Sequence, residues 1–331
     1  MTGPRNLRCG IVGAGRTRHG TGPFLASFLE GADCDVVGVV GRSFSRGRSA
    51  AEDLAQRLGH AVEAHACVED LLASGLDALV IAAPDEVHLP ALRASLEART
   101  PVLCEKPLVQ AEEHEAVAAL VDGFRSRDIL LMEGCQWPMA MAAFDGLYPE
   151  RSPESTRFAM RLSPIGPGPL MLRNSLSHLI SLIQVEWPVG PDTTVESLAF
   201  EGSGGVEDGL VTSFDLRNRP SEVGDESTDR GSAACRLELV VCPDQPRPAW
   251  VEIDGHRMGR EVDLVTYAIS FVAGERKISV DDPTKTLVYR FADLVKSPSR
   301  ERYRIESNRV EQRARLYSHI VRGLVEHLAS S

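Results

Sequence analysis

The sequence predicts an α/β fold, with a doubly wound parallel sheet followed by an α+β domain whose sheet is open and mostly antiparallel. Short apolar runs alternate with amphipathic helical segments through the first 133 residues, and a glycine-rich turn follows the first run. Strand-like runs with few helices between them dominate the remainder. The length of 331 residues suits two domains, which we place at 1–133 and 134–331.

Composition and charge exclude several classes of protein. Hydrophobic residues make up 43% of the chain and charged residues 25%, as in ordinary globular proteins. There is no apolar run long enough to span a membrane and no basic leader before the first strand, so we expect a cytoplasmic protein. The net charge of -11 argues against a nucleic-acid partner. The seven cysteines include no CxxC pair, which favours core positions over disulfides or a metal site.

A glycine-rich turn follows the first expected strand, which runs from Leu7 to Val12. In dinucleotide-binding folds, two such glycines allow a tight turn and let the backbone approach a pyrophosphate. Arg18 stands where a third glycine is usual, and Pro23 predicts that the helix begins late. An ordinary strand-to-helix turn is the alternative. The candidate cofactor contacts in this turn are Gly13, Gly15, Arg16 and Thr17.

The second expected strand, residues 35–40, ends in Gly41-Arg42-Ser43. Folds specific for NAD usually place Asp or Glu here to bind the ribose 2′-hydroxyl, whereas an arginine can bind a 2′-phosphate. The sequence therefore favours NADP(H) over NAD(H), with Arg42 and Ser43 as contacts. A surface arginine at a strand end is the alternative.

Two later strands, expected at residues 77–83 and 101–105, also end in polar residues. The first runs into Pro84-Asp85-Glu86-Val87-His88 and the second into Lys106-Pro107. Ligands of open parallel sheets bind beyond the carboxyl ends of the strands, so Lys106 is a candidate active-site residue. A solvated lysine after an edge strand is the alternative. We add Pro84, His88 and Glu105 as candidate cofactor contacts, and a cis Lys106-Pro107 bond is plausible.

Further elements complete an alternating pattern in the first half. Helices are expected at 48–58, 67–73, 87–98 and 112–125, and one more strand at 128–132. Such alternation specifies a mostly parallel sheet with helices on both faces.

These residues together resemble the Gfo/Idh/MocA family of NAD(P)-dependent oxidoreductases. The resemblance rests on the glycine turn, the Ala-Pro-x-x-x-His segment at 83–88 and Cys104-Glu105-Lys106-Pro107, and it covers residues 7–135. It implies a Rossmann domain and a second domain whose open sheet makes a homo-oligomer, a dimer or tetramer. In that family the lysine of Glu-Lys-Pro lies beside the nicotinamide and contacts the reacting oxygen, which implies a catalytic Lys106.

The second half reads as an antiparallel sheet and a terminal helix. Strands are expected at 157–162, 195–200, 210–216, 235–241 and 249–253. Residues 218–233 hold almost no apolar residues and predict an exposed, mobile hairpin loop. A final helix is expected at about 306–329, with one apolar side that packs against a domain.

The resemblance also implies substrate contacts in the second half. Gln136 and Trp137 stand where relatives carry residues that face the substrate. Relatives present Asp-x-Gly-x-His-x-x-Asp on a helix. Here Asn174 replaces the first Asp, Leu176 the Gly and Ser181 the last Asp, so that only His178 is retained. This implies that His178 donates or accepts a proton beside Asn174, although the local sequence by itself favours a histidine of the core.

The sequence thus predicts an NADPH-dependent oxidoreductase that reduces a C=O or C=N bond of a small biosynthetic intermediate. The missing aspartates argue against a sugar substrate. Two alternatives remain open: a sugar, cyclitol or diol dehydrogenase of the same family, and a regulatory protein that senses the dinucleotide without catalysis. Retention of Lys106 and His178 favours an enzyme.

Overall fold

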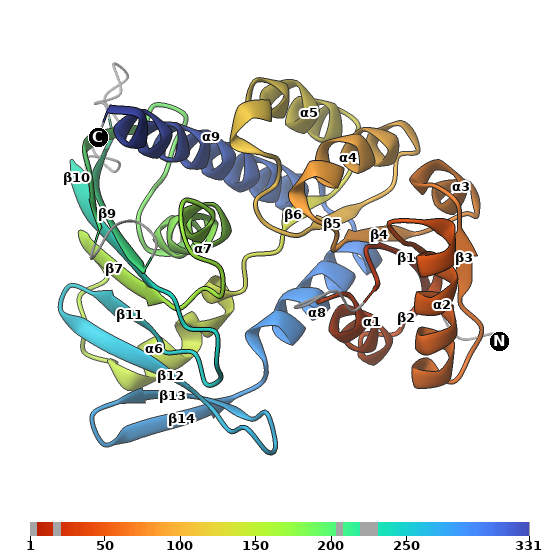
Figure 1. Cartoon of the computed structure of the whole chain (residues 1–331), viewed down its shortest axis with the longest axis horizontal. Coiled ribbons are helices and arrows are strands. Elements are labelled where there is room, and N and C mark those ends of the chain that lie inside the picture. Colours follow the sequence, from red (N-terminus) through yellow and green to blue (C-terminus); the bar gives the residue numbers. More distant parts are fainter. Residues whose placement is uncertain (1–4, 16–20, 203–207, 219–230, 331) are drawn as a thin grey trace. The chain divides into compact units, whose positions relative to one another are not determined.

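The computed structural model describes residues 5–15, 21–202, 208–218 and 231–330 of the chain (Figure 1). The chain divides into two compact units. The first comprises Met1–Gly134 with Thr284–Glu311, and the second comprises Cys135–Pro283 with Gln312–Ser331. The chain therefore passes between the units three times. It does so after residue 134, near the expected boundary at residue 133, and again after residues 283 and 311.

The first unit is built on a parallel sheet with strand order β3-β2-β1-β4-β5-β6. β1 lies between β2 and β4, so successive connections leave it toward opposite edges. A crevice forms at such a point beyond the carboxyl ends of the strands. The strands are β1 Leu7–Val12, β2 Cys34–Val40, β3 Glu63–His65, β4 Ala78–Ile81, β5 Val102–Cys104 and β6 Leu131–Glu133.

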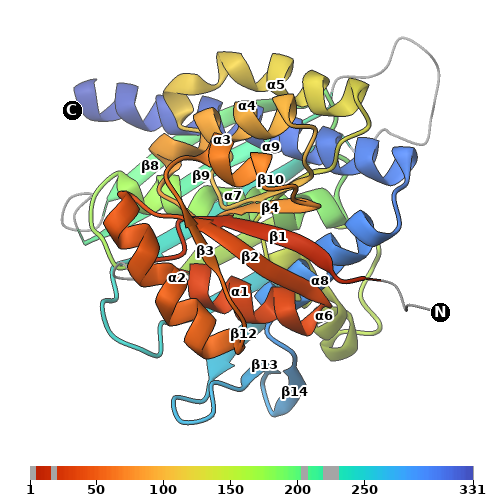
Figure 2. The ribbon, with the colours of Figure 1, turned by 90° about the vertical axis from the view of Figure 1, so that its right-hand side faces the viewer.

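Helices cover both faces of this sheet. One face carries α1 and α2, which contact each other, and the other carries α3, α4 and α5 (Figure 2). α8 lies beside α1, where Lys296 Nζ donates to the carbonyl oxygen of Ala32 at 2.7 Å. The helices are α1 Gly22–Gly31, α2 Phe44–Leu58, α3 Val68–Ala73, α4 His88–Glu97, α5 Glu115–Ser126 and α8 Pro283–Lys296, with 3-10 turns η1 Asp85–Val87 and η2 Ala111–Glu113.

Local sequence explains the elements next to the glycine turn. β4 is buried at all four positions, as expected for a central parallel strand. α2 begins where Ser43 Oγ accepts a hydrogen bond from the backbone N–H of Arg46, and it ends at Gly59, which has a φ of 81°. The buried residues of α2 recur at a helical spacing, namely Gly47, Ala50, Ala51 and Leu54.

The second unit is built on a sheet with strand order β14-β13-β12-β11-β7-β10-β9-β8. All neighbouring strands are antiparallel except β10 and β7. Buried and exposed residues alternate along β9 and β10, and α7 packs on the covered face at β7 and β10. The strands are β7 Arg157–Leu162, β8 Thr194–Gly202, β9 Gly209–Arg217, β10 Ser232–Val240, β11 Ala249–Ile253, β12 His256–Val262, β13 Ile269–Ala273 and β14 Arg276–Val280.

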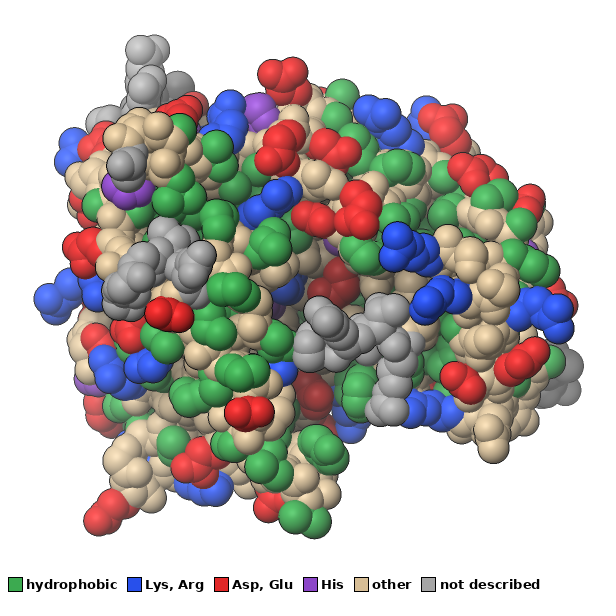
Figure 3. Space-filling view, in the orientation of Figure 1, with side chains coloured by type: hydrophobic (Ala, Val, Ile, Leu, Met, Phe, Trp, Pro, Cys, Tyr) green, Lys and Arg blue, Asp and Glu red, His purple; other side chains and the backbone are tan. Residues whose placement is uncertain are grey.

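Four helical elements complete the chain: the 3-10 turn η3 Trp137–Ala140, α6 Met141–Leu147, α7 Leu170–Glu186 and the long α9 Arg300–Ser330. Within the described residues, no helix is both long and apolar enough to cross a membrane. Acidic and basic side chains are interspersed on the face seen in Figure 3.

The fold class predicted from the sequence is confirmed, while several element bounds differ. The strand expected at 128–132 is β6 at Leu131–Glu133, because Asp128 occupies a left-handed turn with a φ of 53°. Residues 232 and 233, expected in a loop, begin β10, and residues 219–230 lie outside the described part. The final helix begins at Arg300, six residues earlier than expected.

Candidate active site and cofactor site

The glycine turn lies at the carboxyl end of β1 and depends on close backbone contact. Gly13 has a φ of 90°, and a Cβ there would lie 2.6 Å from the backbone nitrogen of Ala83. Its own N–H donates to the carbonyl oxygen of Val40 at 2.9 Å, which ties the turn to the end of β2. Among the described residues, no atom lies within 4 Å of the place where a Cβ on Gly15 would stand. Arg16, Thr17 and Arg18 lie outside the described residues.

Gly22 is a packing residue that sequence reasoning placed only in an enlarged loop. It is the first residue of α1, and a Cβ on it would lie 2.8 Å from Ala14 Cα. The start of the helix therefore presses on the glycine turn. Close packing of helix against strand is the role that the third glycine has in dinucleotide folds. Its place ten residues beyond Val12 and next to Pro23 was the available signal.

Arg42 follows β2 at the neighbouring strand end and is exposed. Neither Arg42 nor Arg46 forms an ion pair among the described residues, whereas Arg48 lies 3.9 Å from Glu52 one turn later. The hydroxyl of Ser43 caps α2 and lies 3.1 Å from that of Ser45. Two guanidinium groups that form no ion pair with the described residues thus lie at the start of α2.

The ends of β4 and β5 bring Lys106 and His88 into one region of the first unit. Lys106 is half-buried and its bond to Pro107 is cis. His88 is buried, with Nε2 2.8 Å from the carbonyl oxygen of Ala83 and Nδ1 2.8 Å from that of Pro107. Pro84 is exposed at the start of the η1 turn. The His88 ring therefore contacts protein backbone through both nitrogens.

Glu105 precedes the lysine, and its N–H donates to the carbonyl oxygen of Ile81 at 2.8 Å. Removal from water raises the pKa of this carboxyl group, and attraction to Lys106 and His88 offsets only part of the rise. Burial also raises the pKa of the neighbouring Cys104 thiol well above its ordinary value. The end of β5 is thus a poorly solvated region that contains a lysine.

In the second unit, the two expected substrate contacts differ in exposure. Gln136 is half-buried, whereas the Trp137 ring is 3% exposed and lies 6.2 Å from the Phe271 ring. The guanidinium of Arg260 lies 5.9 Å from the centre of the Trp137 ring, and burial lowers the pKa of that guanidinium. Trp137 is therefore a core residue whose ring packs against β12 and β13.

α7 carries the expected histidine and its neighbours. His178 is 7% exposed, while Asn174, four residues earlier on the same helix, is exposed. Ser181, which replaces an aspartate of the expected pattern, donates from Oγ to the carbonyl oxygen of His178 at 2.8 Å. Residue 181, where relatives carry a carboxylate, is therefore a serine whose hydroxyl forms a hydrogen bond within the helix.

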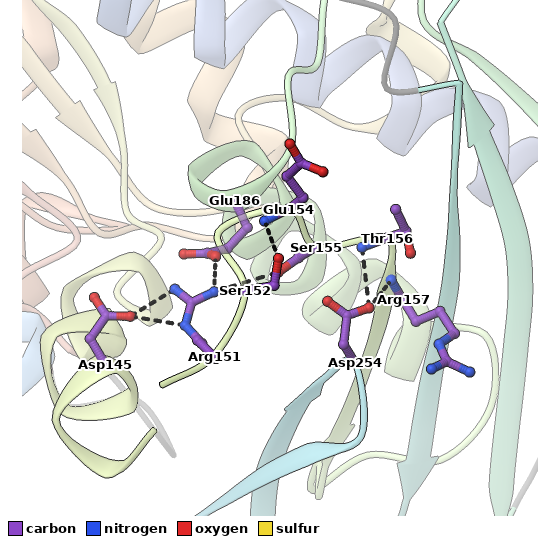
Figure 4. A network of polar contacts seen from close by, with 9 residues as sticks. All are labelled: Asp145, Arg151, Ser152, Glu154, Ser155, Thr156, Arg157, Glu186 and Asp254. Atoms are coloured by element: carbon purple, nitrogen blue, oxygen red, sulfur yellow. Dashed lines mark hydrogen bonds and ion pairs between the residues drawn. The ribbon is translucent and has the colours of Figure 1, made fainter. Parts of the chain in front are cut away.

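A buried ion pair fixes the end of α7 that lies beyond His178 (Figure 4). Arg151 Nη1 lies 2.7 Å from Glu186 Oε2, and its Nη2 lies 2.7 Å from Asp145 Oδ1 on α6. The side chains of Arg151 and Glu186 are 13% and 8% exposed. The guanidinium therefore joins α6 to α7, and removing it leaves a carboxylate in a poorly hydrated place.

We expect Arg151→Ala to lower the melting temperature by about 5 °C or more, because breaking a buried pair costs about 3 kcal/mol. Thermal unfolding followed by circular dichroism measures the change. Arg157→Ala is the matched control, because Arg157 is exposed on β7 and only its backbone N–H donates to Asp254 in Figure 4. Equal melting temperatures for the two variants would contradict the role given to the pair.

Comparison with known proteins identifies the first unit. Residues 7–134 match the family model GFO_IDH_MocA, described as an oxidoreductase family with an NAD-binding Rossmann fold. The sheet and helices of residues 7–134 are therefore similar to the Rossmann domain of the Gfo/Idh/MocA family. The expectation drawn from Glu-Lys-Pro and the glycine turn is confirmed.

Curated relatives and solved structures of the family cover different parts of the chain. Inositol 2-dehydrogenase of Corynebacterium glutamicum is 34% identical over 110 residues, which are 33% of this chain and 31% of that protein. Inositol 2-dehydrogenase 1 of Saccharopolyspora erythraea is 39% identical over 103 residues, 31% of this chain and 29% of that protein. The matched part thus spans less than a third of each relative's length.

A solved structure extends the likeness in fold to both units. The 3-ketoreductase KijD10 of Actinomadura kijaniata, solved with NADP, has a TM-score of 0.64 at 20% identity and covers 96% of this chain and 97% of that one. The Gfo/Idh/MocA family model includes the positions of Gly13 and Lys106 but ends before α7. The family model therefore does not reach Asn174 and His178.

Proposed function

We propose that this protein is an NADPH-dependent oxidoreductase that reduces a C=O or C=N bond of a small biosynthetic intermediate. The observation that carries the proposal is Lys106, a half-buried lysine at the carboxyl end of β5 in a Gfo/Idh/MocA Rossmann domain. The glycine turn fits a dinucleotide, because Gly13 admits no side chain and no described atom occupies the space beside Gly15. When bound, the nicotinamide supplies the hydride.

Arg42 is the residue that we assign to cofactor choice. It follows β2, where a 2′-substituent of the adenosine ribose is bound in dinucleotide folds. Its guanidinium is exposed and has no ion-pair partner among the described residues, so it can form charge-assisted hydrogen bonds to a phosphate. Arg46, one turn into α2, adds a second positive charge.

We expect Arg42→Ala to weaken NADPH binding about ten- to a hundredfold, since hydrogen bonds to charged groups contribute roughly 1.5–3 kcal/mol. NADH binding should change little because NADH lacks the 2′-phosphate of NADPH. Titration of each cofactor, followed by nucleotide fluorescence, measures both constants. Arg48→Ala is the control, because that arginine already pairs with Glu52. Equal affinity of the wild type for NADPH and NADH would contradict the cofactor assignment.

Chemistry at the substrate is assigned to Lys106 and His178. A lysine at this strand end can bind and polarise the oxygen or nitrogen of the bond that is reduced. His178 on α7 is the proposed proton donor, with Asn174 as its neighbour and Gln136 as a substrate contact. An amide at residue 174 can orient a ring but adds no charge, which favours proton donation over proton removal.

A dehydrogenase acting on a cyclitol is the second candidate, favoured by the inositol 2-dehydrogenases among the relatives. The deciding experiment measures both directions with the purified protein. NADPH oxidation is followed with cyclohexanone, 2-keto-myo-inositol and 1-pyrroline-2-carboxylate, and NADP⁺ or NAD⁺ reduction with myo-inositol. Efficient oxidation of myo-inositol would replace the proposed reductase by the dehydrogenase. Nucleotide binding without turnover in either direction would favour a sensor.

We also propose a cytoplasmic homo-oligomer formed through the uncovered face of the second sheet. β7, β9 and β10 present half-buried and exposed residues there, around a hollow of about 480 Å³. The hollow is lined by charged, polar and small residues, including Arg157, Ala159, Asp215 and Arg236. Light scattering on the purified protein tests this assembly, and a monomer at all concentrations would contradict it.

A further inference from the structure

The turn that carries Lys106, residues 105–108, is held by two side chains, one from the start of α4 and one from the end of β6. β5 pairs with β4 at Ile81 and Cys104, and with β6 at Cys104 and Glu133. Backbone hydrogen bonds fix the start of the turn: Glu105 N–H donates to Ile81, and Gly134 N–H donates to Cys104 at 2.7 Å. Beyond Glu105, the backbone hydrogen bonds of the sheet end, and side chains hold the backbone of the turn.

On the β4 side, the turn is held by His88, which is 1% exposed. Nδ1 of His88 lies 2.8 Å from the carbonyl oxygen of Pro107, the residue after the lysine. Nε2 lies 2.8 Å from the carbonyl oxygen of Ala83. Carbonyl oxygens only accept hydrogen bonds, so a ring nitrogen that carries a proton donates to the carbonyl oxygen that it faces. The imidazole therefore bridges the end of β4 and the lysine turn.

On the β6 side, the turn is held by Glu133, which is 5% exposed. Its Oε1 accepts a hydrogen bond from the backbone N–H of Leu108 at 3.2 Å. Glu133 is the last residue of β6, so its backbone position is set by the sheet. The turn is thus bound at residue 107 from one side and at residue 108 from the other.

We propose that His88 and Glu133 form a clamp that positions Lys106 by fixing residues 107 and 108. The clamp rests on the proposed function, in which Lys106 contacts the reacting group. Both clamp residues are buried and reach backbone groups directly after the lysine, so they act through the turn. Displacement of a reacting group by about 1 Å can cost 10²-fold in rate, which gives such positioning a measurable effect.

The composition of the chain allows a direct test. Lysine occurs at only four positions, Lys106, Lys277, Lys285 and Lys296. Protein made with [ε-¹³C]lysine therefore gives four side-chain signals by NMR, and Lys106→Arg identifies the signal of Lys106. The spectra are recorded without nucleotide on the full chain, so the test requires neither a substrate nor cofactor binding.

We expect His88→Ala and Glu133→Ala each to shift or broaden the Lys106 signal while the other three signals stay in place. Glu133→Gln keeps an oxygen that can accept from Leu108 N–H, so its Lys106 signal should move less than in Glu133→Ala. His60→Ala and Glu113→Ala are matched controls: His60 contacts Glu30, and Glu113 accepts from the backbone N–H of Gln110. Neither control should move the signal.

An unmoved Lys106 signal in both alanine variants would overturn the clamp, whatever the protein catalyses. If one alanine variant fails to fold, the other and His88→Gln still decide the question. NADPH titration of the same samples separates the two proposals. A wild type that does not bind NADPH defeats the proposed function and leaves the NMR result standing. Variants that bind NADPH with an unmoved lysine defeat only the clamp.

Discussion

Lys106→Ala is expected to lower the turnover number by about 10² or more while the protein keeps its fold, the usual effect of removing a positioned polar group. Lys106 follows β5, and the backbone directly after it is held by contacts of His88 with Pro107 and of Glu133 with Leu108. The loss should therefore appear in kcat with little change in melting temperature or in NADPH affinity. NADPH oxidation with the most active carbonyl or imine of the panel measures it.

The control for this prediction is Lys277→Ala, which removes an exposed lysine of β14 whose Nζ lies 2.7 Å from Glu261 on β12. Wild-type turnover of Lys106→Ala would show that the lysine takes no part in the chemistry. A large fall in melting temperature would instead assign it to folding. Lys106→Met keeps most of the apolar stem and separates lost packing from lost charge.

The sequence predicts the parallel sheet and its ligand edge well, because both depend on local patterns. Short apolar strands and the turns after them are encoded by consecutive residues, so the carboxyl ends that carry Gly13 and Lys106 could be located. The strands Arg157–Leu162 and Ala249–Ile253 have the expected bounds for the same reason. In each case, the residues that indicate the strand and the turn after it lie within about ten positions of one another.

The edge of the second sheet was missed for a physical reason. β12 and β14 are rich in charged residues and have at most one buried position each, so they lack the apolar alternation of a half-buried strand. The helix α8 was also missed. The first turns of α9 are charged as well, and only the buried Tyr303 marks them as helical, which explains the late start that we expected.

Long-range hydrogen bonds account for the remaining differences at the site. We expected His88 to contact the cofactor, but its ring nitrogens lie against Ala83 and Pro107, the latter 19 residues away. Residues that far apart become neighbours only when β4 and β5 pair, so the local sequence could not indicate the contact. Ser43 likewise caps α2, a role readable from its place before a helix.

His178→Ala is expected to lower the rate of reduction by about 10² to 10⁴, the contribution of a general acid in a well-formed site. α7 holds the histidine in a buried position, and the Arg151 ion pair fixes the end of that helix. A carboxylate beside an imidazole stabilises its protonated form and suits a base that removes an alcohol's proton. Asn174 supplies no charge, so reduction should be faster than oxidation.

Two further variants test this assignment. His319→Ala removes an exposed histidine of α9 and should leave turnover unchanged. Asn174→Asp places a carboxylate one helical turn from His178 and should raise the rate of NADP⁺-dependent oxidation relative to NADPH-dependent reduction. Rates in both directions are measured across pH with the same substrate pair. An unaffected His178→Ala would remove the histidine from the chemistry, because neither water nor Lys106 is expected to replace a positioned acid without loss.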